Sequence, residues 1–289
     1  MAFLRLIRFK NLILLFLALF LTHFYYTKYE DISLNFNITS FILLVISILL
    51  ITSAGNVIND LLDTETDKIN KPEKVIINKF ISYEKGLKIY FLLNLTSLIF
   101  ASYLSFKIGN LKLLFIFIVT IFLLYLYSEI LKGKPLLGNL LIALLTPAPI
   151  LILPYFDLPE SHIKTTVLNT VCIIYIFGFL LNLIREIIKD IEDYKGDKQQ
   201  KINTFSVKYG TEKSIFLVRV LIVFTMILLQ ISIVYLFKIN PFLASYLFVF
   251  IQTPLLYIFL QITEKNTKKM SFILKIILLF GVFSMLLIN

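Results

Sequence analysis

Two groups of aspartates have the residue type and the spacing needed to bind a metal ion. In each group Asp recurs at positions i, i+3 and i+7, and the groups are Asp60, Asp63 and Asp67, then Asp190, Asp193 and Asp197. Positions spaced in this way lie within about 60° of one another around a helix. Each group is therefore expected to present three carboxylates on one helical face, joined by Asn56 in the first group and Glu186 in the second.

Carboxylates that converge in this way favour a hard divalent cation. Six of them would repel one another strongly unless positive charge lay between them. The chain has one Cys and two His, so ligands that are all oxygen atoms favour Mg²⁺ over zinc. Mg²⁺ commonly takes one or two carboxylates and completes its shell with water and substrate phosphate. We therefore predict one or more Mg²⁺ ions that bind a diphosphate, with the ligands Asn56, Asp60, Asp63, Asp67, Asp190, Asp193 and Asp197.

Basic residues lie close to both groups in the sequence. Lys68, Lys71 and Lys74 accompany the first group, and Lys189 and Lys198 accompany the second. Ammonium groups form charge-assisted hydrogen bonds with phosphate oxygens. These side chains are therefore expected to neutralise the phosphate charge that the metal leaves uncompensated.

Long apolar runs show which elements must position these residues. Of the 289 residues, 58% are hydrophobic and 16% are charged, and the mean hydropathy is +0.88, which is too apolar for a soluble domain of this size. A membrane-spanning helix needs about 20 apolar residues. Nine segments meet this need: 11–27, 36–58, 87–106, 111–131, 136–153, 166–188, 214–237, 242–262 and 271–288. The Asp groups then open two long loops, 59–86 and 189–213.

The domain organisation follows from these segments. No Gly-, Ser- or Pro-rich linker divides them, so we expect one all-α integral membrane domain over residues 1–289, a single bundle of nine transmembrane helices. The first apolar run lacks a small-residue cleavage site, which favours a span over a signal peptide. Prolines at positions 147, 149 and 154 are expected to break or kink the fifth span. The constant offset of 130 residues between the Asp groups suggests an internal duplication of a four-helix unit.

The distribution of Lys and Arg predicts the orientation in the membrane. With the N-terminus in the cytoplasm, cytoplasmic segments hold 21 basic residues, and the opposite side holds Lys28, Lys107, Lys112, Lys164 and Lys238. This is a strong positive-inside bias. It explains the net charge of +10 without nucleic acid as a partner. Both Asp groups are thus expected on the cytoplasmic side of a prokaryotic cytoplasmic membrane.

The wording of the two Asp segments resembles that of a known family. The first reads Asn59-Asp60-x-x-Asp63-x-x-x-Asp67 followed by Asn70-Lys71-Pro72, and the second reads Arg185-Glu186-Ile187-x-Lys189-Asp190-x-x-Asp193-x-x-Gly196-Asp197. Both resemble the motifs of the UbiA superfamily of intramembrane prenyltransferases, whose fold has nine spans. The resemblance implies Mg²⁺-dependent transfer of an isoprenoid chain from an allylic diphosphate to a lipophilic acceptor. An allylic carbocation would form and be captured by the acceptor.

A third stretch extends the resemblance to the archaeal-type members that prenylate geranylgeranylglyceryl phosphate. It reads Tyr127-Ser128-x-x-Leu131-Lys132 followed by Pro135-Leu136-Leu137-Gly138-Asn139. The resemblance implies that Tyr127 and Lys132 lie near the diphosphate. The catalytic residues would be Asp63, Asp67, Asp193, Asp197 and Lys132. The substrate-binding residues would be Asn59, Lys71, Tyr127, Arg185, Lys189 and Lys198.

Departures from the family pattern leave other acceptors open. Lys71-Pro72 replaces the usual Arg-Pro pair, and Lys is a point charge without a bidentate fork. An aromatic acceptor such as 4-hydroxybenzoate or a quinone precursor is the alternative, and Glu186 is a candidate base for either acceptor. A cation transporter would need charges near the bilayer midplane, and the central parts of these spans lack carboxylates.

Overall fold

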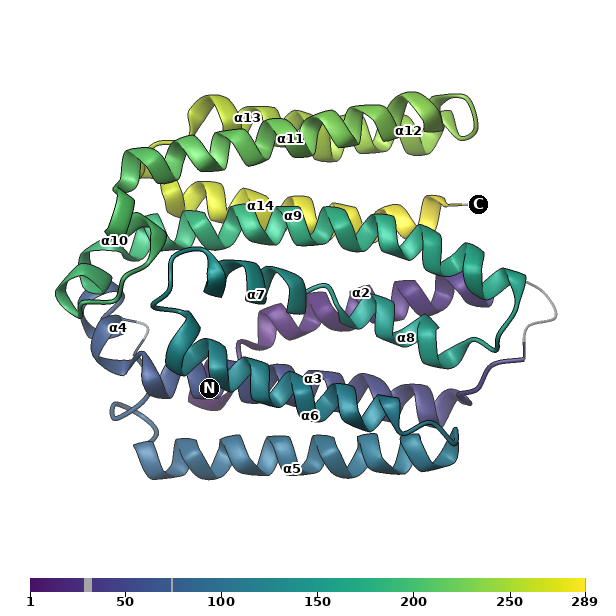
Figure 1. The fold of residues 1–289 in the computed structure, drawn as a ribbon, viewed down its shortest axis with the longest axis horizontal. Coiled ribbons are helices and arrows are strands. Elements are labelled where there is room, and N and C mark those ends of the chain that lie inside the picture. The colour runs from purple at the N-terminus through teal and green to yellow at the C-terminus, as the bar shows by residue number, and fades with distance from the viewer. Residues whose placement is uncertain (29–32, 74, 289) are drawn as a thin grey trace.

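The computed structural model describes residues 1–28, 33–73 and 75–288. Within them, nine helical segments are long and apolar enough to cross a membrane: Phe9–Thr27, Ile38–Leu62, Tyr83–Lys107, Lys112–Leu131, Leu137–Asp157, His162–Gln199, Thr211–Phe237, Pro241–Gln261 and Glu264–Leu287. Figure 1 shows them lying alongside one another, from α5 (Tyr83–Lys107) at one side to α11 (Thr211–Phe237) at the other. The predicted all-α membrane bundle is confirmed.

Polar side chains mark where several spans begin. α3 (Ile38–Leu62) follows Asn37, whose Oδ1 accepts a hydrogen bond from the Ser40 backbone N–H at 2.9 Å. Ser82 and Ser161 cap α5 and α9 (His162–Gln199) in the same way. Each cap gives a partner to an N–H group that the helix itself leaves unpaired.

Three spans are interrupted within the bundle. α7 (Leu137–Leu145) and α8 (Pro149–Asp157) are separated at residues 146–148, so the predicted break is confirmed at Pro147 and Pro149, whereas Pro154 lies within α8. α6 (Lys112–Leu126) continues into a π-helical turn, η1 (Tyr127–Leu131). A second such turn, η2 (Phe248–Gln252), joins α12 (Pro241–Leu247) to α13 (Thr253–Gln261). The first of these turns shapes the site described below.

The sixth span does not end where its apolar residues end. α9 runs 38 residues to Gln199, so the loop predicted from residue 189 is wrong for residues 189–199. Two short helices, α4 (Thr64–Asn70) and α10 (Phe205–Tyr209), pack against this polar extension. The packing buries Gly196 and Asp197. Tertiary contacts therefore maintain a helix that hydropathy alone does not predict.

Packing separates an interior from a lipid-facing surface. One buried cluster includes Leu44, Leu104 and Leu153, and another includes Ile184 and Val218. Outward-facing aromatic residues are largely exposed: Phe106 on α5 by 73%, Phe115 on α6 by 65% and Phe216 on α11 by 68%. In a membrane such side chains contact lipid rather than water.

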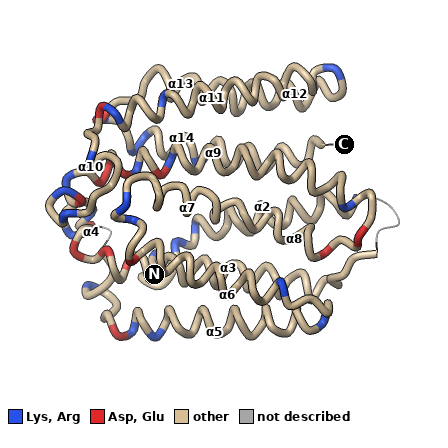
Figure 2. Tube along the Cα trace, viewed as in Figure 1, with Lys and Arg blue, Asp and Glu red and all other residues tan. Residues whose placement is uncertain are grey.

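Charged residues gather at one end of the bundle. Figure 2 shows most Lys, Arg, Asp and Glu at the end that carries α4 and α10, and few along the middle of the helices. At the other end Asp157 is fully buried, and it accepts hydrogen bonds from the Tyr26 hydroxyl at 2.5 Å and the Phe36 N–H at 2.9 Å. That network joins α8 to α2 (Phe9–Thr27) and to the start of α3, and it is structural.

Candidate active site

The first Asp group does not lie on one continuous helix. α3 ends at Leu62 and α4 begins at Thr64, so Asp63 occupies the junction, where its N–H bonds to the Asn59 carbonyl at 2.9 Å. The expectation of a single helix is therefore wrong for this group, although its three carboxylates still face one cavity as predicted. Both expectations are confirmed for the second group, because α9 is unbroken from Asp190 to Asp197 and all three carboxylates line that cavity.

Both groups nevertheless line one cavity of about 1360 Å³. It brings together nearly all the residues singled out in the sequence: Asn56, Asn59, Asp60, Asp63, Asp67, Lys71, Tyr127, Lys132, Arg185, Glu186, Lys189, Asp190, Asp193 and Asp197. Lys198 is the exception, because its side chain is exposed and its Nζ lies 3.3 Å from the Tyr194 hydroxyl outside the cavity. Lys68 is also exposed, where it pairs with Glu65 at 2.6 Å. Lys74 lies outside the described residues.

Lysines from two different segments form ion pairs with the carboxylates. Lys71 Nζ lies 2.6 Å from Asp193 Oδ1, so the residue after the first motif reaches across to the second. Lys132 Nζ donates to Asp63 Oδ2, which also accepts from Asn59 Nδ2 at 2.7 Å. Each Asp group thus has a lysine in place close to its carboxylates.

The side chain of Asn70, the last residue of α4, lies against the backbone of α9. Asn70 Oδ1 accepts from the Gly196 N–H at 2.8 Å, and Asn70 Nδ2 donates to the Asp193 carbonyl at 2.9 Å. A Cβ atom added to Gly196 would lie 2.5 Å from Asn70 Nδ2, which is too close for any side chain. Glycine at this position therefore allows the two motifs to meet.

The π-helical turn η1 positions the third stretch. The Lys132 N–H bonds to the Tyr127 carbonyl at 2.9 Å, five residues back, which widens the helix by one residue. Gly138 then permits α7 to pack on this turn, since a Cβ there would lie 2.7 Å from the Leu131 carbonyl oxygen. Tyr127 interacts electrostatically with Glu186 and Asp63, one residue from each Asp motif.

Two residues of the site were not assigned this position from the sequence. Arg8 was counted only in the positive-inside bias, but its guanidinium lies 2.8 Å from Asp60 Oδ1. Arg8 has a left-handed backbone (φ 54°), and the preceding residue, Ile7, accepts a hydrogen bond from Asn56 Nδ2 at 3.1 Å. Asn139 Nδ2 donates to Asp190 Oδ2 at 3.0 Å. Asn139 belongs to the third stretch, so the family pattern was the available signal, whereas Arg8 had none beyond its charge.

Burial and charge set the protonation of the groups outside the spans. Burial and the charge of Asp63 raise the pKa of Asp67 to about 6. Burial disfavours the charged form of Lys132, but the carboxylates of Asp63, Asp197 and Asp67 together outweigh it and raise the pKa of this lysine. Asp193 has the same effect on the pKa of Lys71. Both lysines are therefore cationic at neutral pH, whereas Asp67 releases its proton only near pH 6.

The donor atoms fit Mg²⁺ brought in with a phosphate better than a preformed metal cage. Among the described residues, no three Asp, Glu, His or Cys side chains are arranged to hold an ion by themselves. The cavity instead offers carboxylate and amide oxygens on facing elements. Mg²⁺ typically uses one or two carboxylates together with water and substrate phosphate, which this donor set can supply.

Comparison with known proteins agrees with this site. A profile of the UbiA prenyltransferase family matches residues 15–280. The digeranylgeranylglyceryl phosphate synthase of Methanosphaera stadtmanae is 32% identical over 208 residues, which cover 72% of this chain and 70% of that protein.

Solved structures show the same fold. One, described as giving structural and mechanistic insights into digeranylgeranylglyceryl phosphate synthase in membranes, matches with a TM-score of 0.69 at 25% identity, covering 98% of this chain and 96% of that one. A UbiA homologue from Archaeoglobus fulgidus bound to DMAPP and Mg²⁺ matches with a TM-score of 0.60 at 16% identity and covers both chains fully. From its sequence match over most of its length and its nine-helix bundle, the chain belongs to the UbiA prenyltransferase family.

Proposed function

We propose that this prenyltransferase uses Mg²⁺ to transfer an isoprenoid chain from an allylic prenyl diphosphate to geranylgeranylglyceryl phosphate. The observation that carries the proposal is one cavity with two chemically different parts. Both Asp groups line its polar end, and apolar side chains from several spans line the remainder. The similarity to a digeranylgeranylglyceryl phosphate synthase supports this acceptor, and the homologue with bound DMAPP and Mg²⁺ supports the donor and the ion.

The polar end provides the ligands for the ion and the diphosphate. Seven residues would hold Mg²⁺: Asn56, Asp60, Asp63, Asp67, Asp190, Asp193 and Asp197. When bound, the ion supplies positive charge to the diphosphate oxygens as the carbon–oxygen bond breaks. We assign the main catalytic roles to four carboxylates. Asp63 and Asp193 pair with Lys132 and Lys71, and Asp67 and Asp197 interact electrostatically with both lysines.

Lys71 and Lys132 provide fixed positive charge from the protein itself. Each is paired with a carboxylate, Asp193 and Asp63 respectively, and each is mostly buried. Preorganised cations in a site shielded from water stabilise developing negative charge strongly. Asn59 and Tyr127 line the same part of the cavity and would orient the diphosphate.

The apolar part of the cavity suits an isoprenoid chain. Leu15, Ile51, Phe117, Ile174 and Leu278, from five different helices, line it. Hydrocarbon chains gain free energy from leaving water for such a surface. These side chains also exclude water, which would otherwise capture the allylic carbocation before the acceptor does.

Glu186 serves as an anchor for cations rather than as a base. Its carboxylate is buried and lies 2.7 Å from Lys189 Nζ and 3.1 Å from Arg185 Nη1. A carboxylate held by two cations is stabilised in its charged form and accepts a proton poorly. The acceptor hydroxyl therefore loses its proton after it has attacked the carbocation, and the departing diphosphate is the base that takes it.

We place the protein in the cytoplasmic membrane of a prokaryote, and the charge distribution supports a site on the cytoplasmic side. The carboxylates and most basic residues share the end of the bundle that carries α4 and α10 (Figure 2). The positive-inside rule assigns a Lys- and Arg-rich end to the cytoplasm. Labelling of a Cys placed in α10 tests this orientation, because that Cys should react only from the cytoplasmic side.

One experiment tests the donor, the ion and the acceptor together. Purified protein would be incubated with labelled geranylgeranyl diphosphate, Mg²⁺ and either geranylgeranylglyceryl phosphate or 4-hydroxybenzoate. We expect transfer to the glyceryl phosphate, loss of transfer in EDTA, and loss in Asp63→Ala and Asp193→Ala. The exposed Glu65→Gln is the matched control and should retain activity. Transfer to 4-hydroxybenzoate alone would show that the acceptor is aromatic, and unchanged turnover in both Asp variants would contradict the metal assignment.

A further inference from the structure

Lys275 is an ionisable residue inside a membrane span, at a position that the transfer chemistry above does not use. It lies eight residues after the first residue of α14 (Thr267–Phe283), about 12 Å along the helix axis. Its side chain is half-buried and lines the cavity, and its Nζ lies 3.5 Å from Asn11 Oδ1 on α2. Ionisable groups within spans are costly and usually face a cavity through which a polar substrate passes or in which it binds.

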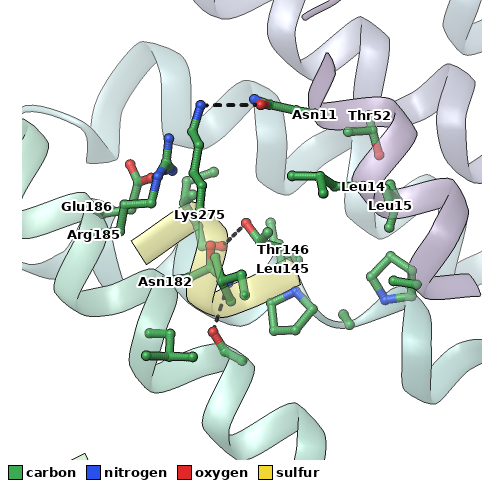
Figure 3. Close-up of a pocket in the computed structure, with 18 of the residues that line it drawn as sticks. Asn11, Leu14, Leu15, Thr52, Leu145, Thr146, Asn182, Arg185, Glu186 and Lys275 are labelled. Carbon is green, nitrogen blue, oxygen red and sulfur yellow. Dashed lines mark hydrogen bonds and ion pairs between the residues drawn. The ribbon is translucent and has the colours of Figure 1, made fainter. Parts of the chain in front are cut away.

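Arg185 approaches the same place from α9. Figure 3 shows the Lys275 side chain between Asn11 on one side and the Arg185–Glu186 pair on the other. Arg185 Nη1 bonds to Glu186 at 3.1 Å, whereas its Nε is buried without a hydrogen-bond partner in the structure. Five donors in a guanidinium fork suit an oxyanion with several oxygens.

Charge separates the polar end of the cavity into two regions. In the first, five Asp side chains outnumber the two lysines by three: Asp63, Asp67, Asp190, Asp193 and Asp197 with Lys71 and Lys132. In the second, which we call the cation cluster, four cations outnumber two carboxylates by two: Arg8, Arg185, Lys189 and Lys275 with Asp60 and Glu186. Arg8 connects the two carboxylates of this cluster, because it forms an ion pair with Asp60 and interacts electrostatically with Glu186.

The two regions suit different anions. The carboxylate-rich region repels a phosphate unless a divalent cation intervenes. The cation cluster can bind a phosphate directly, and its excess of two positive charges matches a phosphomonoester dianion. Apolar side chains of α2, Leu14 and Leu15, lie next to Asn11 in Figure 3 and offer a surface for a hydrocarbon chain attached to that phosphate.

We propose that Lys275, Arg185 and Asn11 form a second anion subsite that binds the phosphate of the acceptor without Mg²⁺. The inference rests on the proposed function, because it concerns the acceptor of the same reaction. It assigns the phosphomonoester as the feature of the acceptor that the enzyme recognises. The acceptor phosphate would then bind to cations other than Lys71 and Lys132, so that the two anions do not compete for the same side chains.

Kinetics with two acceptors test the subsite. Lys275→Met keeps the length of the side chain and removes its charge, and Lys268→Met changes an exposed lysine of the same helix as the matched control. We expect Lys275→Met to raise KM for geranylgeranylglyceryl phosphate about 10-fold or more, because loss of a hydrogen bond from a charged group reduces binding by about this factor. KM for geranylgeranyl diphosphate should change less than twofold. With geranylgeranylglycerol, which lacks the phosphate, the variant and the wild type should not differ.

Binding in EDTA separates the subsite from the reaction. Without Mg²⁺, titration of the wild type with geranylgeranylglyceryl phosphate should show binding that Lys275→Met weakens and Lys268→Met does not. Lys275→Arg should retain it, and Lys275→Gln replaces the Met variant if that protein does not fold. Wild-type enzyme that binds this acceptor but prenylates only another compound would contradict the proposed function and not the subsite.

Three outcomes would overturn the subsite. The first is a wild type that transfers the isoprenoid chain to geranylgeranylglyceryl phosphate and a Lys275→Met variant with the same KM for that acceptor. The second is an equal loss with geranylgeranylglycerol, which would indicate a structural role for the lysine. The third is equal competition by phosphatidic acid in nanodiscs or by inorganic phosphate, which would show that the cluster binds a lipid headgroup or free phosphate rather than the acceptor.

Discussion

Lys71 and Asp193 join the two Asp motifs: the lysine Nζ lies 2.6 Å from Asp193 Oδ1 and 2.8 Å from Asp193 Oδ2. The two residues are 122 positions apart in the chain. Lys71 directly follows the last residue of α4, and Asp193 lies on α9. Glu192 adds a weaker contact at 3.7 Å. Since both partners are mostly buried, this pair fixes the spacing of the motifs and holds a cation where the diphosphate is proposed to bind.

Removal of the charge at Lys71 should reduce both stability and donor binding. Lys71→Gln leaves Asp193 without its ionic partner, which we expect to cost about 1–3 kcal/mol of unfolding free energy. KM for the prenyl diphosphate should rise about 10-fold or more, measured with saturating acceptor. Lys71→Arg is the matched variant and should retain most activity, because a guanidinium can contact both carboxylate oxygens. Equal losses in both variants would show that the length of the lysine matters rather than its charge.

Gly196→Ala tests the approach of α4 to α9. The added Cβ would lie 2.5 Å from Asn70 Nδ2, so Asn70 must move and release its bonds to α9. We expect a loss of about 1–3 kcal/mol in stability together with lower activity. Gly133→Ala, where the nearest atom is 3.8 Å away, is the control and should be near neutral.

A double variant shows whether Asn70 is the cause. Asn70→Ala in the Gly196→Ala background removes the clash, so thermal denaturation should show part of the lost stability regained. No recovery would mean that another contact of Gly196 limits the packing of the two helices.

Asp67 should make stability depend on pH in the absence of metal. Its pKa is raised to about 6 in the folded chain, against about 4 when unfolded, so folding favours the protonated acid. The stabilisation is present below pH 4 and is lost as the pH rises through 6. In EDTA, Asp67→Asn should therefore melt at a higher temperature than the wild type at pH 8, with the difference vanishing towards pH 4.

Mg²⁺ with a prenyl diphosphate should reverse that order at pH 8. The wild type would gain stability from the ligands, and Asp67→Asn would gain less because it lacks one carboxylate. Glu65→Gln, at an exposed position of the same short helix, should follow the wild type in both conditions. A wild type that melts above Asp67→Asn at pH 8 in EDTA would contradict the raised pKa.

Helix bounds support a further proposal about the organisation of the chain. We propose that residues 1–289 form one domain that arose by duplication of a four-span unit. Moved by the 130 residues that separate the Asp groups, Tyr83–Lys107 corresponds closely to Thr211–Phe237, and Lys112–Leu131 to Pro241–Gln261. Each pair agrees to within two residues at both ends. The two halves differ at the site, since Lys275 has Leu145 as its counterpart.

The sequence alone determined the spans, the fold class and the carboxylates of the site. Hydropathy is a property of each segment by itself, because lipid imposes the same length and composition on every span. The positions of the six carboxylates followed from spacing, and the structure brings them to one cavity: Asp60, Asp63, Asp67, Asp190, Asp193 and Asp197.

Only the tertiary structure decided which charges meet. The break at Asp63, the extension of α9 to Gln199 and the π-helical turn at Tyr127 all depend on contacts between distant segments. Arg8 and Lys275 look in the sequence like ordinary basic residues near the ends of spans, and Lys198 looks like a phosphate ligand. In the folded chain Arg8 and Lys275 line the cavity, whereas Lys198 points away from it. The direction of a side chain depends on how its helix packs, and the local sequence does not encode that packing.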